Sequence, residues 1–271
     1  MAYTEIDKPS DYFETLLSTG DGGSQTFTGL DFQPDWVWSK RRQTHVHQLY
    51  DSVRTAGSGK ALQSDASAAE GGDGGTYGYL SSFTSDGFAS TAGSSNNNYF
   101  NADGGTYVFW NWKAGTSFTN DASATGIGTI DSAGSFNNDA GFSIVTYSGT
   151  GSNGTIKHGL NAKPKIILWK RTDNNAGAVN WIVQSTLFGN QTKLVLNTTE
   201  AFSTNSSFSQ TDNWTSSLID LKNYEGQNAS NGTYVAYCFA EKTGFSKFGS
   251  YIGNDNADGT FVYLGFKPAF V

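Results

Sequence analysis

A chain of 271 residues has room for two domains of ordinary size. Charged residues make up only 15% of it and the formal net charge is −7, so we expect no nucleic-acid partner, because the phosphates would be repelled. Glycine (33 residues) and aromatic residues (14%) are abundant, a composition that favours many short strands and turns. No apolar run approaches the roughly 18–20 residues that span a bilayer, so we expect no membrane insertion.

Residues 1–11 (MAYTEIDKPSD) form a short polar leader. The leader has neither the basic region nor the apolar region of a signal peptide, so we expect no secretion by that route. The first β-rich unit is predicted to begin at residue 12.

An internal repeat organises the rest of the chain. Residues 29–42 (GLDFQPDWVWSKRR) return as residues 159–172 (GLNAKPKIILWKRT), so that Pro34 and Pro164 are 130 positions apart (164 − 34). Because proline lacks an N–H, we expect both prolines just before the first ladder-paired residue of a strand. A third, clipped version of the pattern closes the chain as LGFKPAFV.

A second landmark recurs late in each copy. Residues 105–112 (GTYVFWNW) return as residues 232–239 (GTYVAYCF), an offset of 127 (232 − 105). Two landmarks in the same order at nearly the same offset indicate a tandem array of one unit. We place the first unit at 12–115 and the second at 141–246.

The units are predicted to be built from strands. Side chains of residues 106–112 alternate between two faces: Tyr107, Phe109 and Asn111 on one, and Val108, Trp110 and Trp112 on the other. No window shows a convincing helical period. The predicted fold class is all-β, with two tandem β-sandwich or jelly-roll-like units plus a C-terminal half-repeat.

Two segments lie outside the units. Residues 116–140 are poor in large apolar side chains and are interpreted as a linker or a decorated edge. Residues 247–271 are interpreted as a truncated third repeat, which cannot bury a core alone and is expected to pack on the second unit or on a neighbouring subunit, adding a strand to a sheet. The apolar residues predicted to make this oligomer contact are Phe266, Pro268, Phe270 and Val271.

Catalytic and metal-binding signatures are weak. Most carboxylates stand in turn contexts, where they usually cap the turn, and no nucleophile elbow is present. His45 and His47 would point to the same side of a strand, but no third ligand is evident, and the Asp/Asn/Gly turns lack the spacing of a calcium loop. The basic clusters around Lys40 and Lys170 are interpreted as solvated strand ends. We therefore predict no enzyme activity, no metal and no cofactor.

Aromatic residues give the more specific functional hypothesis. Most of the seven tryptophans are expected to pack in cores. Trp181 and Trp214 have polar neighbours in sequence, where an exposed ring can stack on a sugar, and tyrosines in Gly/Ser/Asn-rich loops offer similar surfaces. The predicted receptor- or glycan-binding residues are Tyr77, Tyr79, Tyr99, Trp181 and Trp214.

The framework motifs resemble a known family. The segments DYFETLLSTGDGGSQTFTGLDFQPDWVWSKRR, HQLYDSVR, LSSFTSDGF and GGTYVFWNWKAG, together with AGFSIVTYSGTGSNGTIKHGLNAKPKIILWKRT and NGTYVAYCFAEKTGFSKFGSY, resemble a repeated domain of virion-associated tail proteins of marine bacteriophages, particularly those that infect cyanobacteria. The resemblance covers nearly everything after residue 11. It brings no catalytic or binding residues to transfer.

The resemblance implies a structural protein of the virion, assembled in the host cytoplasm. Such a protein is a tail-fibre, tail-tip or capsid-attached component, with other virion proteins and further copies of itself as partners and a host-surface glycan as a possible target. The alternative is a free carbohydrate-binding, lectin-like module, which we expect to be monomeric and to show exposed aromatic platforms.

Overall fold

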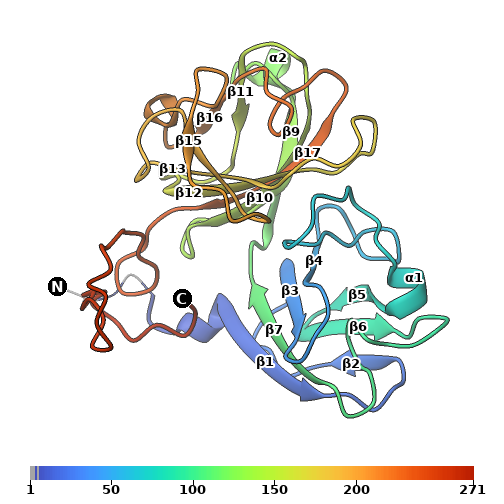
Figure 1. The fold of residues 1–271 in the computed structure, drawn as a ribbon. Helices are drawn as coiled ribbons and strands as arrows, with labels where there is room; N and C mark the ends of the chain where they lie inside the picture. Colours follow the sequence, from blue (N-terminus) through green and yellow to red (C-terminus); the bar gives the residue numbers. More distant parts are fainter. Residues whose placement is uncertain (1–3, 5) are drawn as a thin grey trace.

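The computed structural model describes residue 4 and residues 6–271, and their strands form four antiparallel sheets (Figure 1). A 3-10 helix, η1 (Pro9–Asp11), ends the predicted leader, of which residues 1–3 and 5 lie outside the described residues. The elements of the first unit are β1 (Phe13–Thr19), β2 (Gln25–Phe27), β3 (Trp36–Arg41), β4 (Gln48–Asp51), α1 (Gly74–Tyr77), β5 (Tyr79–Thr84), β6 (Gly87–Thr91) and β7 (Thr106–Trp112).

The rest of the chain forms the second unit and the C-terminal segment. Its elements are β8 (Thr116–Asn120), α2 (Ala122–Thr125), β9 (Ser132–Asn137), β10 (Phe142–Ser148), β11 (Gly154–Lys157), β12 (Ile166–Arg171), β13 (Ile182–Ser185), β14 (Thr192–Val195), β15 (Ser203–Thr204), η2 (Thr211–Asn213), β16 (Leu218–Leu221) and β17 (Thr233–Phe239). The all-β prediction is confirmed. Neither α-helix exceeds four residues, and none in the described chain is long and apolar enough to cross a membrane.

The internal repeat is also a repeat of topology. The first unit has one sheet in the order β1-β7-β3-β4, and the second contains the equivalent run β10-β17-β12-β13. The opposing sheets carry the equivalent pairs β2-β6 and β11-β16. The register matches as well, because Phe13 pairs with Trp112 as Phe142 pairs with Phe239. The two sequence copies therefore fold as two copies of one sandwich.

One glycine position, present in both units, shows why the copies share local sequence. Gly20 follows β1 and donates its N–H to the Gly105 carbonyl at 2.7 Å, and Gly149 follows β10 and makes the same bond to Gly232 at 2.7 Å. A Cβ on either glycine would lie 2.2 Å from a carbonyl oxygen of a neighbouring loop. Only glycine allows this close approach of two backbone segments.

Residues 116–140 are not a linker. They form β8, α2 and β9, and β9 pairs along β10 so that the second unit's sheet extends beyond the strand that corresponds to β1. Small residues suit this position because Gly134 lies against β10, where a Cβ would come within 2.0 Å of the Ile144 carbonyl oxygen. No strand of the described chain covers the corresponding outer edge of β1.

Side-chain alternation in β7 follows the sequence prediction. Tyr107, Phe109 and Asn111 are buried, whereas Val108, Trp110 and Trp112 are half-buried on the opposite face. The first set lies on the side of β2, β5 and β6, since Tyr107 and Phe109 belong to the same core cluster as Phe27 and Phe88. The second set therefore lies on the outer face of the sheet.

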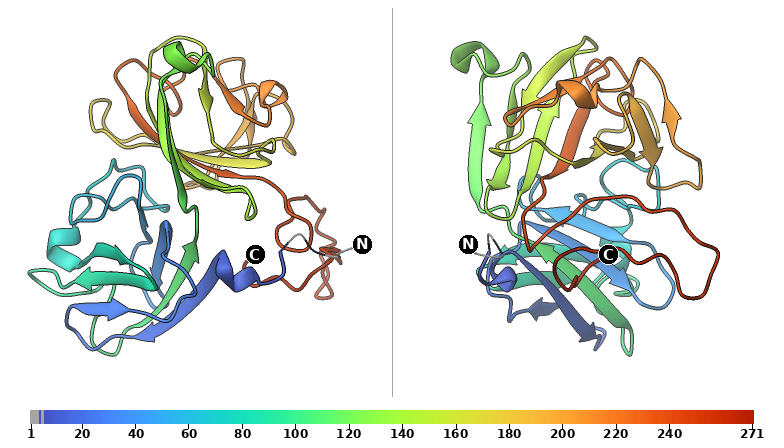
Figure 2. Two further views of the ribbon diagram at one scale, coloured as in Figure 1. Left: turned by 180° about the vertical axis from the view of Figure 1, so that it is seen from behind. Right: turned by 90° about the vertical axis from the view of Figure 1, so that its left-hand side faces the viewer.

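A third core cluster joins the two units. The indole of Trp36 stacks on the ring of Tyr237, with centroids 4.4 Å apart and planes 18° apart, and also stacks on Phe142. Figures 1 and 2 show the large sheet of the second unit lying over the first unit, with β11 and β16 on its far side. Residues from both outer sheet faces thus form one apolar interface.

A buried polar group crosses this interface. The Tyr237 hydroxyl donates to Asp51 Oδ2 at 2.6 Å, and Arg54 Nε donates to the same oxygen at 2.7 Å. Burial opposes the charge on Arg54, yet Asp51, Tyr237 and Glu70 together raise the pKa of its guanidinium above the ordinary value. The charges at the interface are therefore held in a paired, hydrogen-bonded state.

The C-terminal residues 247–271 form no strand and run as a long loop beside the first unit (Figure 2). The expected added strand is thus not made within the chain. Phe270 instead packs against Phe13, Trp110 and Trp112 on the outer face of β1 and β7, at ring-centroid distances of 6.0, 5.6 and 5.6 Å. The remaining predicted contact residues are half-buried (Phe266, Pro268) or exposed (Val271).

Candidate binding site

A groove of about 910 Å³ lies between the two units. One wall comes from residues 53–70 of the first unit, and the rest comes from β8, β9, β10, β17 and the loops beside them. Hydroxyl side chains predominate in the lining: Thr119, Thr129, Ser132, Thr146, Ser148, Thr150, Thr172 and Thr233.

The floor is the outer face of the second unit's sheet near the strand ends. Ser148 pairs with Thr233 across β10 and β17, and the Thr172 N–H donates to the Thr233 carbonyl at 2.8 Å. The hydroxyls of Thr172 and Thr233 are 2.9 Å apart. The backbone polar groups here are already paired in ladders. Thr146 Oγ1 donates to the Ala133 carbonyl at 3.2 Å and Thr172 Oγ1 bonds to Thr233, so these hydroxyls offer a ligand mainly their remaining acceptor lone pairs.

The wall from the first unit carries two cations and one carboxylate, and one of the cations, Arg54, is also paired with the buried Asp51. Glu70 accepts from Arg54 at 3.0 Å through Oε2 and from Lys60 at 2.9 Å through Oε1. Its backbone N–H donates to the Thr172 carbonyl at 3.0 Å, which fixes the wall against the floor. This side of the groove is therefore polar without a large net charge.

Two carboxylates stand on the opposite rim and are held by their own loop. Asp121 accepts from Ser123 Oγ and from the Ala124 N–H, and these bonds, the Ser123 bond first, lower its pKa. Asp131 Oδ1 accepts from the Ala122 N–H at 2.8 Å. Both side chains are exposed and cap helix α2 or its approach.

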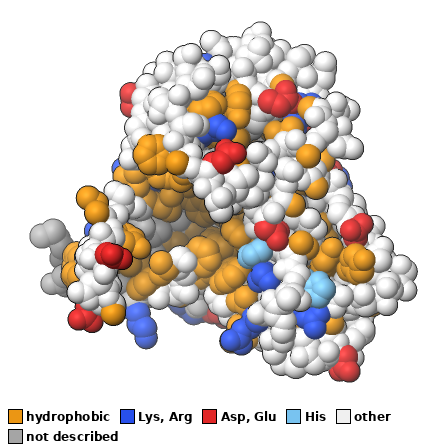
Figure 3. All heavy atoms as spheres, in the orientation of Figure 1, with side chains coloured by type: hydrophobic (Ala, Val, Ile, Leu, Met, Phe, Trp, Pro, Cys, Tyr) orange, Lys and Arg blue, Asp and Glu red, His pale blue; other side chains and the backbone are white. Residues whose placement is uncertain are grey.

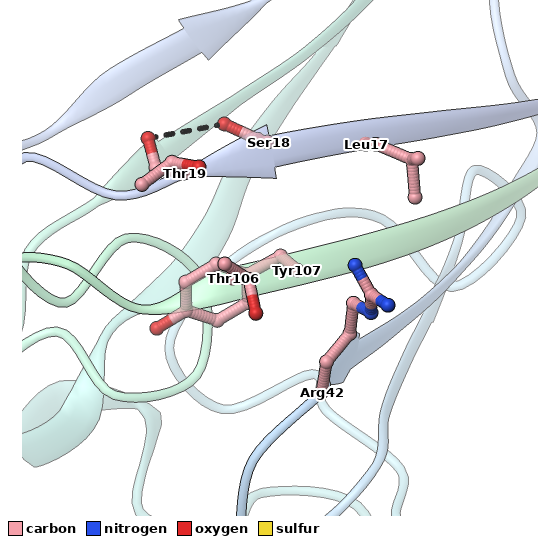
Figure 4. A pocket seen from close by; sticks show the side chains of 6 residues that line it. All are labelled: Leu17, Ser18, Thr19, Arg42, Thr106 and Tyr107. Atoms are coloured by element: carbon pink, nitrogen blue, oxygen red, sulfur yellow. Dashed lines mark hydrogen bonds between the residues drawn. The ribbon is translucent and has the colours of Figure 1, made fainter.

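The first unit has a smaller hollow of about 160 Å³ at the corresponding place (Figure 4). Its lining residues are Leu17, Ser18, Thr19, Arg42, Thr106 and Tyr107. Offsets of 129, 130 and 127 for the three strands, read from the matched pairings, give the equivalent residues Thr146, Tyr147, Ser148, Thr172, Thr233 and Tyr234. All six of these line the groove, so both recesses occupy one position of the repeat.

The glycan-binding residues predicted from sequence do not line the groove, and three are buried. Trp181 is 0% exposed and donates from Nε1 to the Gln63 carbonyl at 2.8 Å, across the interface between units. Trp214 is 2% exposed and donates to Ser209 Oγ at 2.8 Å. The prediction of exposed rings was wrong here because polar sequence neighbours surround an inward-pointing side chain.

The three predicted tyrosines belong to the core of the first unit. Tyr99 is buried, and its ring lies 5.4 Å from that of Tyr77 in an edge-to-face arrangement. Tyr77 and Tyr79 are half-buried against the core cluster that contains Phe27 and Phe88. The three rings are therefore parts of that core, not exposed loop tips.

His45 and His47 lie in the loop between β3 and β4 and not on a strand, and His47 and Lys170 have structural partners. His47 Nδ1 accepts from Trp38 Nε1 at 2.7 Å, and burial lowers the pKa of His47. No three His, Cys, Asp or Glu side chains are grouped to hold a metal ion in the part of the chain that is described. Lys170 is buried, not solvated; it donates to the carbonyls of Ser67 and Val179, and burial lowers its pKa to about 8.

An aromatic surface lies on the outer face of the first unit's sheet. Trp38 and Trp110 meet edge to face at 6.0 Å, and Trp112 lies beside them with Phe270 of the C-terminal segment across it. In Figure 3, hydrophobic side chains gather in the recess between this segment and the two units, and two histidine side chains lie near its rim beside Lys and Arg side chains.

No curated protein and no solved structure matches the chain. One family model matches residues 8–271, nearly the whole length, including both units, the groove and the C-terminal segment. The chain therefore belongs to the family described as "Domain of unknown function (DUF7483)".

Proposed function

We propose that the protein is a structural component of a bacteriophage virion, of the tail-fibre, tail-tip or capsid-attached fibre type, which assembles with further copies of itself and contributes to contact with the host surface. The resemblance of the framework motifs to tail proteins supports the virion role. The assembly role is carried by a single observation, the apolar surface of residues 248–271.

This segment presents large apolar side chains to water. Ile252 is 89% exposed, Phe261 85% and Tyr263 72%, whereas the most exposed large apolar side chains elsewhere in the described chain are Leu17 (64%) and Phe202 (63%). Burying such side chains stabilises by about 1.5–3 kcal/mol each, so a partner surface would gain substantially by covering them.

The sequence of the segment resembles that of strands in the second unit, although the segment itself forms no strand. Its residues 250–262 (SYIGNDNADGTFV) correspond to residues 145–156 (VTYSGTGSNGTI), which enter β10 and β11 in the second unit. A second copy offers a place for such a strand at the outer edge of β1, because the equivalent strand β10 is covered by β9. Head-to-tail contacts of this kind, repeated from copy to copy, build a fibre.

Sedimentation velocity over a range of concentrations tests the assembly. We expect the wild-type chain to be larger than a monomer, and we expect Phe261→Ser with Tyr263→Ser, or Leu17→Lys on the β1 edge, to shift it toward the monomer. Phe202→Ser is the matched control, since this side chain is as exposed as Leu17 but lies outside both surfaces. A monomeric wild-type chain at all concentrations would overturn the assembly role.

Mass spectrometry of purified phage particles tests the virion role, and the absence of the chain from them would contradict it. The alternative of a free lectin-like module drew its support from exposed aromatic platforms. Trp181 and Trp214 are buried, so that support is lost.

A further inference from the structure

We propose that the groove between the units binds a neutral saccharide chain, and that the hollow of the first unit is a reduced copy of the same binding position. This inference rests on the host-contact role proposed above and names the class of ligand for it. It stands whether or not the chain assembles, because none of its lining residues belongs to the C-terminal segment.

The size of the groove fits this ligand. Small-molecule sites have volumes of roughly 300–1,000 Å³, and the groove, at about 910 Å³, lies near the upper end. It is lined from both units, with Lys60 and Glu70 on one side and Thr119 and Thr129 on the other. An elongated ligand of several linked rings would therefore contact both units at once.

The chemistry of the lining points to a polyol. A threonine or serine hydroxyl both donates and accepts hydrogen bonds, as does each hydroxyl of a sugar. The floor strands are paired on both sides at this place, so a peptide cannot bind by strand addition there. The cations Arg54 and Lys60 are engaged with Glu70, and Asp121 and Asp131 add negative charge, so a phosphorylated or sulfated ligand is disfavoured.

The repeat shows which residues distinguish the two recesses. At two of the six shared positions both units carry a small hydroxyl side chain: Thr19 and Ser148, and Thr106 and Thr233. At two more positions, occupied by Ser18 and Tyr147 and by Tyr107 and Tyr234, the tyrosine hydroxyls donate to carbonyls within their own units. At the other two, the first unit has Leu17 and Arg42 where the second has Thr146 and Thr172. An apolar and a charged side chain thus replace two hydroxyls in the first unit, which also lacks the additional wall formed by β8 and β9.

This correspondence suggests a pair of substitutions for the groove, which place larger side chains at the half-buried Thr146 and the buried Thr172. Thr146→Leu with Thr172→Arg gives the groove the residues of the first unit at equivalent positions, in a sheet of the same topology and register. The exchange removes two hydroxyls from the floor and places a bulky cation over it. Its matched control is Thr116→Leu with Ser117→Arg, which introduces the same side chains at exposed positions of β8 that do not line the groove.

Isothermal titration calorimetry with neutral hexose oligosaccharides of increasing length, and with a sulfated series of the same lengths, tests the proposal. We expect at least one neutral oligosaccharide to bind saturably, the sulfated series to bind more weakly, and the groove exchange to lower affinity about tenfold or more, since two hydrogen bonds are lost. The control should bind as the wild-type chain does. Thermal melting of each variant establishes that it is folded.

Three results would overturn the saccharide site: no binding of any neutral oligosaccharide, tighter binding of the sulfated series, or full affinity in a folded Thr146→Leu, Thr172→Arg chain. Sedimentation of the same samples separates this outcome from the assembly role. A monomer that binds a neutral oligosaccharide contradicts assembly alone, and an oligomer that binds none contradicts the saccharide site alone.

Discussion

Removing the Tyr237 hydroxyl tests whether the polar contact at the interface stabilises the union of the two units. The hydroxyl donates to the buried carboxylate of Asp51 at 2.6 Å, and a hydrogen bond to a charged group contributes about 1.5–3 kcal/mol. In Tyr237→Phe the carboxylate keeps its bond from Arg54 Nε at 2.7 Å, so no buried charge is left alone. We therefore expect a loss of roughly 2 kcal/mol in the free energy of unfolding.

Asp51→Asn should cost more than Tyr237→Phe. It removes the closest negative charge from the buried Arg54, whose other carboxylate partner, Glu70, lies at 3.0 Å, and breaking a buried ion pair costs about 3–5 kcal/mol. Tyr147→Phe is the matched control, because that hydroxyl donates at 2.6 Å to a neutral carbonyl within the second unit and its loss should cost about 1 kcal/mol.

Urea denaturation followed by tryptophan fluorescence and circular dichroism measures all three variants. In Tyr237→Phe and Asp51→Asn we expect the two units to unfold in distinct transitions. In Tyr147→Phe we expect the number of transitions to be the same as in the wild type. A Tyr237→Phe chain as stable as the wild type, or an Asp51→Asn chain more stable than Tyr237→Phe, would refute the reasoning.

Three further predictions concern single positions. Burial lowers the pKa of His158 to about 4, so the unfolded state binds more protons between about pH 6.5 and 4; stability should fall by up to ~3 kcal/mol as pH falls through this window, and thermal melts of His158→Gln should show a flatter profile. Gly20→Ala and Gly149→Ala should each cost at least about 2 kcal/mol in urea denaturation, whereas Gly249→Ala, with no atom near its Cβ, should be neutral. Burial raises the pKa of the Cys238 thiol to about 12, so it should react with a disulfide reagent only at the rate of unfolding; rapid labelling of the native chain would contradict its burial.

The repeat and the strand pattern could be predicted because they depend on local sequence. Pro34 lies just before β3 and Pro164 just before β12, as predicted, and the side chains of β7 alternate as expected. Residues 116–140 could not be assigned by the same signals. Strands at the end of a sheet bury fewer large side chains than central ones, so the edge strand β8 and its neighbour β9 have the composition of a linker.

The candidate site was missed because it depends on contacts between units. Thr146, Thr172 and Thr233 are far apart in sequence, and each alone is typical of a strand end. Aligning the two copies pairs them with Leu17, Arg42 and Thr106, but it does not show that the three lie side by side. The wall formed by Arg54 and Glu70 has no such signal, because the interface between the units occurs once in the chain.

The pairing of the first and last strand of the first unit determines how that unit responds to mechanical load. Phe13 pairs with Trp112, so the backbone enters and leaves the first sandwich at the same end. Tension applied along the backbone therefore peels β1 and β7 apart one pair at a time, the geometry of least resistance. In the second unit the first strand, β8, pairs with β9 and not with the last strand, β17. Load passed sideways through the Trp36–Tyr237 stack instead has to shear many contacts together. A filament of such units withstands pulling only when the force travels through its lateral contacts.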